Sequence, residues 1–183
     1  MTRLTYSMLG LVVLLGSTNV MVAACQTADA AAPAVAADSV ARRLLIDVQQ
    51  FDSTIMVEAR YATSNNFTGA VLPGYFANRV LLRREAAEAL ARVQRRLKTG
   101  GMGLKVFDGY RPVRATLGMV EWARRNGQVH LIQDGYIASH SRHNLGLAVD
   151  LTLVDWSMAG REVFMGTAYD TFSDAAHFSS ATG

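Results

Sequence analysis

The clearest hydrophobic pattern lies in residues 80–97, where apolar side chains recur every three or four positions. These positions are Val80, Leu81, Ala86, Leu90, Val93 and Leu97. Such spacing puts them on one face of a helix, and the glycines at 100 and 101 supply a stop. We therefore expect a helix over residues 80–97.

A second helix is predicted directly after a turn. Residues 108–110 read Asp-Gly-Tyr, and Pro112 suits the first position of a helix because its fixed φ angle is already helical. The pattern continues to about Arg125, and Gly127 marks the end. Residues 62–75, which are crowded with Asn, Gly, Ser and Pro, are expected to form a loop.

Strand patterns fill the rest of the chain. Residues 147–154 carry the strongest one, and residues 162–165 are its expected hairpin partner across Ala159 and Gly160. Shorter strands are predicted within residues 54–57 and 104–107. Because a short connection forces antiparallel pairing, the predicted fold class is α+β, with a small antiparallel sheet and flanking helices.

Residues 1–24 have the features of a secretory signal. Arg3 precedes a mostly apolar run at residues 8–22, which is too short and too broken to span a bilayer. The sequence Val-Ala-Ala-Cys at residues 22–25 resembles the lipobox of bacterial lipoproteins, in which the thiol is acylated after cleavage. Cys25, the only cysteine, is therefore the predicted lipidation site. The alternative is ordinary cleavage near Ala24 or Ala30.

Residues 25–39 are rich in Ala and read as a tether, and residues 40–183 are long enough for one domain with its own core. The net charge of +3 is small. Basic residues gather on the first predicted helix, at Arg83, Arg84, Arg92, Arg95, Arg96 and Lys98. We interpret them as a solvated face and expect no nucleic-acid partner. The expected location is periplasmic, with a lipid anchor in a bacterial membrane.

The candidate chemistry lies in residues 139–153, SHSRHNLGLAVDLTL. Asp150 falls in the predicted strand between Val149 and Leu151, where an ionised carboxylate needs a cationic partner. His143 lies just before it, and Gly146 allows the backbone to fold back. An imidazole and a carboxylate are ordinary ligands of catalytic zinc. A His–Asp hydrogen bond, or a buried salt bridge to an arginine, is the alternative.

The order Ser141-x-His143-x-x-Gly146-x-Ala148-x-Asp150 resembles the signature of the zinc D-alanyl-D-alanine peptidases, most closely their dipeptidase branch known from vancomycin resistance. Further segments resemble the family in order and spacing: residues 60–62, 66–69, 73–75, 108–112 (Asp-Gly-Tyr-Arg-Pro) and 165–167 with Asp170. The resemblance covers roughly residues 47–183.

The resemblance implies a role for each matched residue. His143 and Asp150 correspond to zinc ligands, with one Zn²⁺ per chain. Arg111 corresponds to an arginine that stabilises the transition state, where attack on an amide builds negative charge on oxygen. Asp170 would hold the free amino end of a small dipeptide substrate, and Ser141 would add a hydrogen bond there. The implied function is zinc-dependent hydrolysis of the D-alanyl-D-alanine dipeptide in cell-wall peptide metabolism.

In this family a later Glu-x-x-His stretch supplies the general base and the third zinc ligand. The sequence to Gly183 contains no such stretch, so we expect a domain that lacks its C-terminal part, and the activity of this chain stays open. A carboxypeptidase acting on longer peptides is a rival within the same class. A non-catalytic, lipid-anchored cell-wall or ligand-binding remnant is the alternative function.

Other polar residues of the matched segments receive smaller roles. Asp108 and Tyr110 are expected to shape the turn that carries Arg111. The remaining histidines, at positions 130, 140 and 177, are assigned no metal-binding role.

Overall fold

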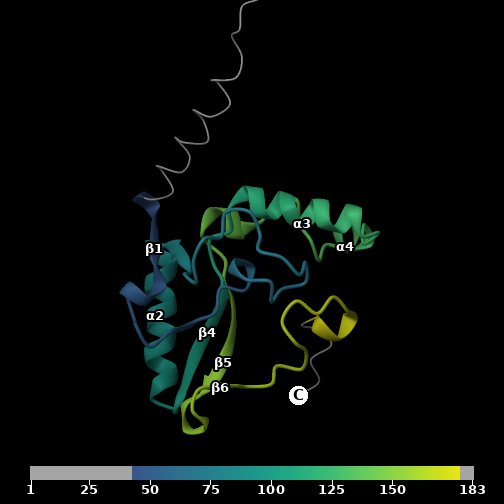
Figure 1. The fold of residues 1–183 in the computed structure, drawn as a ribbon. Helices are drawn as coiled ribbons and strands as arrows, with labels where there is room; N and C mark the ends of the chain where they lie inside the picture. The colour runs from purple at the N-terminus through teal and green to yellow at the C-terminus, as the bar shows by residue number, and fades with distance from the viewer. Residues whose placement is uncertain (1–42, 178–183) are drawn as a thin grey trace, which may run out of the picture. The chain divides into compact units, whose positions relative to one another are not determined.

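The computed structural model describes residues 43–177, so the predicted signal, the tether and Cys25 lie outside the described residues. Figure 1 shows the arrangement of the elements. The strands are β1 (Leu45–Asp47), β2 (Met56–Val57), β3 (Leu81–Arg83), β4 (Met102–Asp108), β5 (Asp150–Asp155) and β6 (Arg161–Glu162). The helices are α2 (Arg84–Lys98), α3 (Val113–Arg125) and α4 (His130–Gln133). The predicted α+β class is confirmed.

Four strands form the main sheet in the order β2-β4-β5-β6, and β1 pairs with β3 in a separate two-stranded sheet. The β4–β5 and β5–β6 pairs are antiparallel. A hairpin partner of β5 is therefore present, but it spans Arg161–Glu162 rather than the predicted residues 162–165. Its turn uses left-handed conformations at Ala159 and Gly160 (φ 56° and 75°), as the sequence predicts. The β2–β4 pair is parallel, so the sheet is mixed rather than wholly antiparallel.

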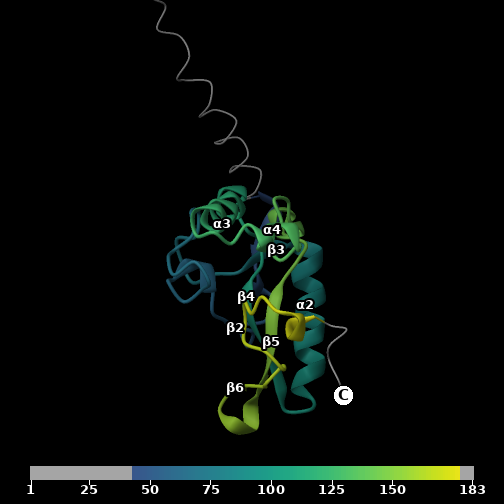
Figure 2. The ribbon, with the colours of Figure 1, turned by 90° about the vertical axis from the view of Figure 1, so that its right-hand side faces the viewer.

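Helix α2 covers one side of the sheet, and the segment after β6 passes on the other side (Figures 1 and 2). Apolar residues of α2, β3 and β4 pack with residues from the loops beside β2 to form the first core. Its buried members are Val48, Ile55, Val80, Leu82, Ala87, Leu90, Leu104 and Val106. Burying these side chains removes apolar surface from water, which stabilises the sheet and α2 as one unit.

A second core lies under α3. Its buried members are Tyr61, Leu72, Ala115, Met119, Val120, Ala123, Leu131 and Ile137. Partly buried aromatic rings pack against it, including those of Phe67, Trp122, Tyr169 and Phe172. Helix α3 starts just after Pro112 and ends at Arg125, as the sequence predicts. The two cores lie beside the end of the sheet where β4 ends and β5 begins, next to the loops of residues 108–112 and 139–146.

The first predicted helix begins later than the pattern indicates. Residues 81–83 form β3 and pair with β1 in the register Leu45↔Arg83, and only Arg84–Lys98 is helical. Leu82 is 1% exposed within this pairing, so its apolar character serves a strand. The backbone partner of β3 lies more than thirty residues earlier in the chain, and a local pattern does not reveal such a partner.

The buried face of α2 also differs from the predicted one. Val93 is 47% exposed, whereas Gln94 is completely buried. The Gln94 amide donates to the Thr54 carbonyl and hydroxyl oxygens, and its Oε1 accepts a hydrogen bond from the Leu104 backbone N–H at 2.8 Å. These bonds compensate for the burial of the amide, because a buried polar group is tolerated when its hydrogen bonds are made.

Strand β5 begins at Asp150 rather than at residue 147, which places Asp150 at the start of the strand instead of inside it. A bulge at Phe107 shifts the β4–β5 register so that Asp108 pairs with Asp150. The bulge therefore brings two carboxylates to the same end of the sheet. No helix within residues 43–177 is long and apolar enough to cross a membrane.

Candidate active site

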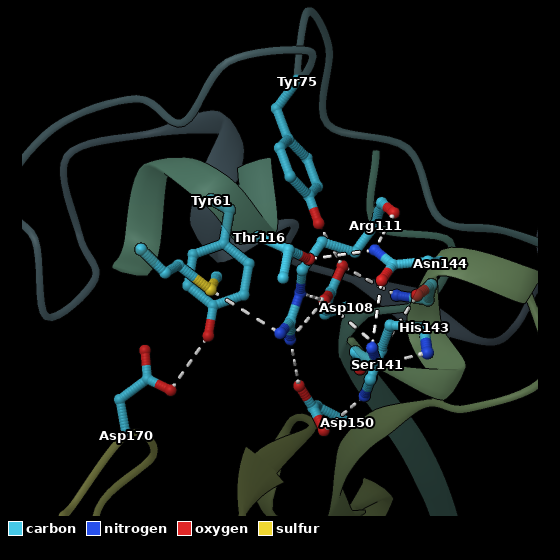
Figure 3. A network of polar contacts seen from close by, with 12 residues as sticks. Tyr61, Tyr75, Asp108, Arg111, Thr116, Ser141, His143, Asn144, Asp150 and Asp170 are labelled. Carbon is cyan, nitrogen blue, oxygen red and sulfur yellow. Dashed lines mark hydrogen bonds and ion pairs between the residues drawn. The ribbon is translucent and has the colours of Figure 1, made fainter. Parts of the chain in front are cut away.

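A cavity of about 290 Å³ lies at this end of the sheet, against the second core. Its lining includes all five domain residues that the sequence singles out: Arg111, Ser141, His143, Asp150 and Asp170. Figure 3 shows these side chains converging from three separate segments of the chain. The structure thus brings the candidates together, while the role of each one stays a prediction.

His143 lies on a short 3-10 helix, Arg142–Leu145, that Ser141 caps. The Ser141 hydroxyl accepts a hydrogen bond from the His143 backbone N–H at 3.2 Å, and Asn144 Oδ1 accepts one from the Ser141 N–H at 3.0 Å. Gly146 ends the helix in a left-handed conformation (φ 68°), and a Cβ there would lie 2.6 Å from Leu45 Cδ2. The left-handed conformation therefore favours glycine here, and a larger residue would also have to displace the Leu45 side chain.

The His143 ring is oriented by a hydrogen bond on its far side. Nδ1 lies 2.9 Å from the Gly109 carbonyl oxygen, so we assign the ring proton to Nδ1. Nε2 then faces Asp150, whose Oδ1 lies 3.4 Å away. Burial lowers the pKa of His143, but the nearby Asp150 carboxylate more than offsets this effect, and the net pKa is raised.

Asp150 has partners on both of its oxygens. Oδ1 faces the imidazole of His143, and Oδ2 lies 3.2 Å from the Tyr169 hydroxyl and 3.4 Å from Arg111 Nη2. Burial raises the pKa of Asp150, yet these partners favour the ionised form and the net pKa is lowered. The contact with His143 and the ion pair with Arg111 are the partners that the sequence offered as the alternative to a metal ion.

Arg111 is held by Asp108, which is 1% exposed. Asp108 Oδ2 accepts hydrogen bonds from Arg111 Nε at 2.9 Å and forms an ion pair with Nη2 at 2.8 Å. The other oxygen, Oδ1, accepts from the Tyr75 hydroxyl at 2.7 Å and from the Gly109 backbone N–H at 2.9 Å. Burial raises the pKa of Asp108, and the Arg111 charge opposes this shift. Asp108 thus fixes the guanidinium, as expected for a residue that shapes the turn.

The turn and the His143 loop are also joined through their backbones. The Arg111 backbone N–H donates to the His143 carbonyl at 3.0 Å. Asn144 Nδ2 donates to the Arg111 carbonyl at 2.8 Å and to the Thr116 hydroxyl at 2.9 Å. Asn144 therefore ties the His143 loop, the Arg111 turn and helix α3 together. The sequence interpretation did not single out Asn144, because nothing local in the sequence shows these distant partners.

Three residues within the described part of the chain bring potential metal-binding atoms within 4.8 Å of one another: Asp108, His143 and Asp150. The oxygens of Asp108 are occupied by the Arg111 guanidinium, the Tyr75 hydroxyl and the Gly109 N–H. His143 Nε2 and Asp150 Oδ1 are the atoms that face each other with room for a shared cation. The most suitable pair for holding a metal is therefore His143 and Asp150.

Asp170 lies on the opposite side of the cavity in a left-handed conformation with φ 59°, which is unusual for a residue with a side chain. Its Oδ1 accepts a hydrogen bond from the Tyr61 hydroxyl at 3.0 Å, whereas Oδ2 is buried and has no hydrogen-bond partner among the described residues. Burial raises the pKa of Asp170 to about 6, the charge of Asp150 adds to the shift, and the Tyr61 hydroxyl and the Phe67 backbone N–H oppose it. A buried carboxylate oxygen without a partner is a suitable site for a cationic ligand group.

The other three histidines do not line this cavity. His130 begins α4 and is exposed, and His140 is also exposed. The His177 ring is exposed and packs against Tyr136, with ring centroids 5.4 Å apart. None of the three is among the residues that line the cavity.

Residues 41–183 match the protein family described as D-ala-D-ala dipeptidase. Among curated proteins, the chain is 34% identical to a D-alanyl-D-alanine dipeptidase of Streptomyces coelicolor, over 71% of this chain and 70% of the relative. It is 36% identical to a D-alanyl-D-alanine dipeptidase of Enterococcus faecium, over 66% of this chain and 65% of the relative. A relative of the same name from Escherichia coli is 29% identical over 73% of this chain and 64% of the relative.

The chain thus spans about two thirds of the length of these relatives. The family match begins at residue 41, covers all the described residues and includes every residue that lines the cavity. The chain therefore belongs to the D-alanyl-D-alanine dipeptidase family of peptidases.

Proposed function

We propose that this protein is a zinc-dependent dipeptidase that hydrolyses D-alanyl-D-alanine in cell-wall peptide metabolism. The relatives named above carry this dipeptidase name. The observation that carries the proposal is the placement of His143 Nε2 and Asp150 Oδ1 at 3.4 Å, beside Arg111, in the cavity that also contains Asp170.

The donor pair fits zinc in chemistry and spacing. Imidazole nitrogen and carboxylate oxygen are both ordinary zinc ligands, at about 2.0–2.2 Å from the ion. Two ligands of a tetrahedral ion at such distances are about 3.4 Å apart, and Nε2 of His143 and Oδ1 of Asp150 are separated by 3.4 Å. A bound Zn²⁺ would polarise the substrate carbonyl and acidify a water molecule.

Arg111 is suited to stabilise negative charge on the carbonyl oxygen of the substrate. Its guanidinium is already held by Asp108, so little reorganisation is needed when the charge develops. Burial lowers the pKa of Arg111, but the Asp108 carboxylate more than offsets this effect, so Arg111 stays protonated. A fixed, permanently charged donor at the lining of the cavity is the arrangement that stabilisation of an oxyanion requires.

Asp170 is suited to bind the free amino group of a dipeptide. The buried Oδ2 has no hydrogen-bond donor in the part of the chain that the structure describes, and an ammonium group would supply one together with a compensating charge. This contact favours free dipeptides over longer peptides, because an acylated nitrogen carries no charge. Ser141 also lines the cavity, but its hydroxyl already accepts the His143 N–H, so any contact with substrate would add to that capping role.

The test combines metal binding with hydrolysis. The purified chain is assayed for zinc content and for release of D-alanine from D-Ala-D-Ala, beside a form that extends to the full length of the relatives. An N-acetylated D-Ala-D-Ala peptide serves as the second substrate. Hydrolysis that requires zinc and prefers the free dipeptide supports the proposal. Preferential cleavage of the acetylated peptide would favour a carboxypeptidase. Zinc-independent ligand binding without turnover would favour the non-catalytic, ligand-binding alternative.

We also propose that the protein is exported and anchored by a lipid at Cys25, with no nucleic-acid partner. The support is the sequence of residues 1–25, with its apolar run and the Val-Ala-Ala-Cys order. Expression with a radiolabelled fatty acid, followed by membrane fractionation, tests this proposal. Label and membrane association should both be lost in Cys25→Ser. A soluble, unlabelled wild-type protein would overturn it.

A further inference from the structure

Tyr169 approaches the metal pair from a segment that the sequence interpretation assigns only to substrate binding. It directly precedes Asp170, in the stretch that follows β6. Its ring packs against Phe107 on β4, with centroids 4.7 Å apart, and the Arg60 guanidinium lies 5.8 Å from the ring centroid. The ring is therefore held in place independently of its hydroxyl group.

The hydroxyl of Tyr169 donates to Asp150 Oδ2 at 3.2 Å. Arg111 Nη2 approaches the same oxygen at 3.4 Å. Two donors on Oδ2 limit rotation of the carboxylate about its terminal bond, and the remaining oxygen, Oδ1, is the one that faces His143 Nε2. The orientation of Asp150 as a one-oxygen ligand therefore depends on what binds Oδ2.

The two donors on Oδ2 are not equivalent. Arg111 is also held by Asp108 through Nε and Nη2, so its guanidinium is shared between two carboxylates. The hydroxyl of Tyr169 is the second donor, and it comes from the segment after β6 rather than from the Arg111 turn. Hydrogen bonds to a ligating group from outside the metal shell commonly change metal affinity by about 10- to 100-fold, because they set the orientation of that group.

We propose that Tyr169 is a positioning residue for the metal site, which orients Asp150 through its hydroxyl group. The proposal rests on the proposed function, because it takes His143 and Asp150 as the metal ligands. The segment after β6 would then have two roles: it carries Asp170, and it orients Asp150 through Tyr169. Metal binding would thus depend on the docking of this segment against β4.

The test is Tyr169→Phe, which removes one oxygen atom and keeps the ring that packs on Phe107. The matched control is Tyr136→Phe, since Tyr136 lines the same cavity but packs against Phe172 and His177 rather than against Asp150. Zinc affinity is measured by competition with a chromophoric chelator, without any activity assay. Circular dichroism and the Tm of the metal-free proteins show whether each variant is folded.

We expect Tyr169→Phe to bind zinc about 10-fold or more weakly than wild type, with Tyr136→Phe within about twofold of it. The rise in Tm on adding zinc should shrink for Tyr169→Phe only. Wild-type affinity in Tyr169→Phe would overturn the inference, and so would an equal loss in both variants. Wild-type protein that binds no zinc would overturn the metal assignment of the proposed function as well, so the two failures are distinguishable.

Discussion

Asp108 holds the guanidinium of Arg111 by two of its nitrogens, at 2.9 Å from Nε and 2.8 Å from Nη2. Because Asp108 is 1% exposed, this pair is formed away from water and has little freedom to rearrange. The remaining surface of the guanidinium faces the cavity and Asp150. These contacts restrict the Arg111 side chain and hold its positive charge beside the proposed metal ligands.

Arg111→Lys should therefore impair catalysis even though the charge is kept. A lysine cannot make both contacts to Asp108 and would not hold its charge at the same point. In a preparation that hydrolyses D-Ala-D-Ala, kcat should fall by about 10²-fold or more, the size expected for loss of one oxyanion donor. Steady-state kinetics measure this change. Arg114→Lys is the control, because Arg114 lies over the Phe76 ring, outside the cavity. A kcat within about twofold of wild type in Arg111→Lys would remove Arg111 from the mechanism.

His143→Ala should abolish stoichiometric zinc binding, since it removes one of the two atoms that face each other across the proposed metal position. Zinc content after dialysis, determined by elemental analysis, measures the effect. His140→Ala is a matched control, because His140 is exposed and its ring contacts the neighbouring Ser139. Equal zinc loss in both variants would indicate adventitious binding by surface histidines.

Asp170→Asn should weaken substrate binding and change its dependence on pH. The pKa of Asp170 is raised to about 6, so the carboxylate that would bind an ammonium group is lost as the pH falls through this value. KM should rise below about pH 6 in wild type. In the variant, KM should be raised by roughly 10- to 100-fold at neutral pH, because a hydrogen bond to a charged group is lost. Asp134→Asn, at an exposed position, should leave KM unchanged.

The same substitution should make the protein more stable above pH 6. The folded-state pKa of about 6 lies above the ordinary aspartate pKa of 3.8, so the folded state binds more protons than the unfolded state between these values. Stability from this group is therefore present at low pH and lost as the pH rises through the folded pKa. Removing the buried charge should raise Tm at pH 8 by about 2–4 °C, or about 1 kcal/mol. A lower Tm in Asp170→Asn would show that the carboxylate is a stabilising partner within the fold.

Gln94→Leu should lower the free energy of unfolding more than Val93→Ala does. Gln94 is completely buried, and its loss would leave the Leu104 N–H and the Thr54 carbonyl without their partner. We expect the free energy of unfolding to fall by about 2–4 kcal/mol, measured by chemical denaturation. Val93→Ala, at a position that is 47% exposed, should cost less than about 1 kcal/mol. Similar losses in the two variants would contradict the structure of this face of α2.

The elements that the sequence predicted well are those whose signals are local. Pro112 marks the start of α3, and Ala159 with Gly160 forms the turn of the β5–β6 hairpin. Gly146 takes a left-handed conformation and lets the backbone fold back, as predicted, although the 3-10 helix that carries His143 was not predicted. In each case the backbone preference of one or two residues decides the structure, so neighbouring positions contain the information.

Where the prediction was wrong, a distant partner decided the outcome. Residues 81–83 form a strand because β1 offers them hydrogen bonds, and Gln94 takes the buried position of α2 because Leu104 and Thr54 satisfy its amide. Tyr169 and Asn144 contact the site only through the packing of separate segments. Their types carry no local signal of these contacts, so sequence patterns could not assign them.

By itself, the sequence determined the α+β class, the family and the set of candidate residues, because motif order and backbone preference depend only on the order of residues in the chain. Only the tertiary structure decided that Arg111, His143 and Asp150 meet at one end of the sheet, and that one buried oxygen of Asp170 makes no hydrogen bond to another of residues 43–177. Distances, burial and shared hydrogen bonds arise between segments far apart in the chain. The physical reason is that the free energy of a charged or polar group depends on its surroundings, which exist only after folding.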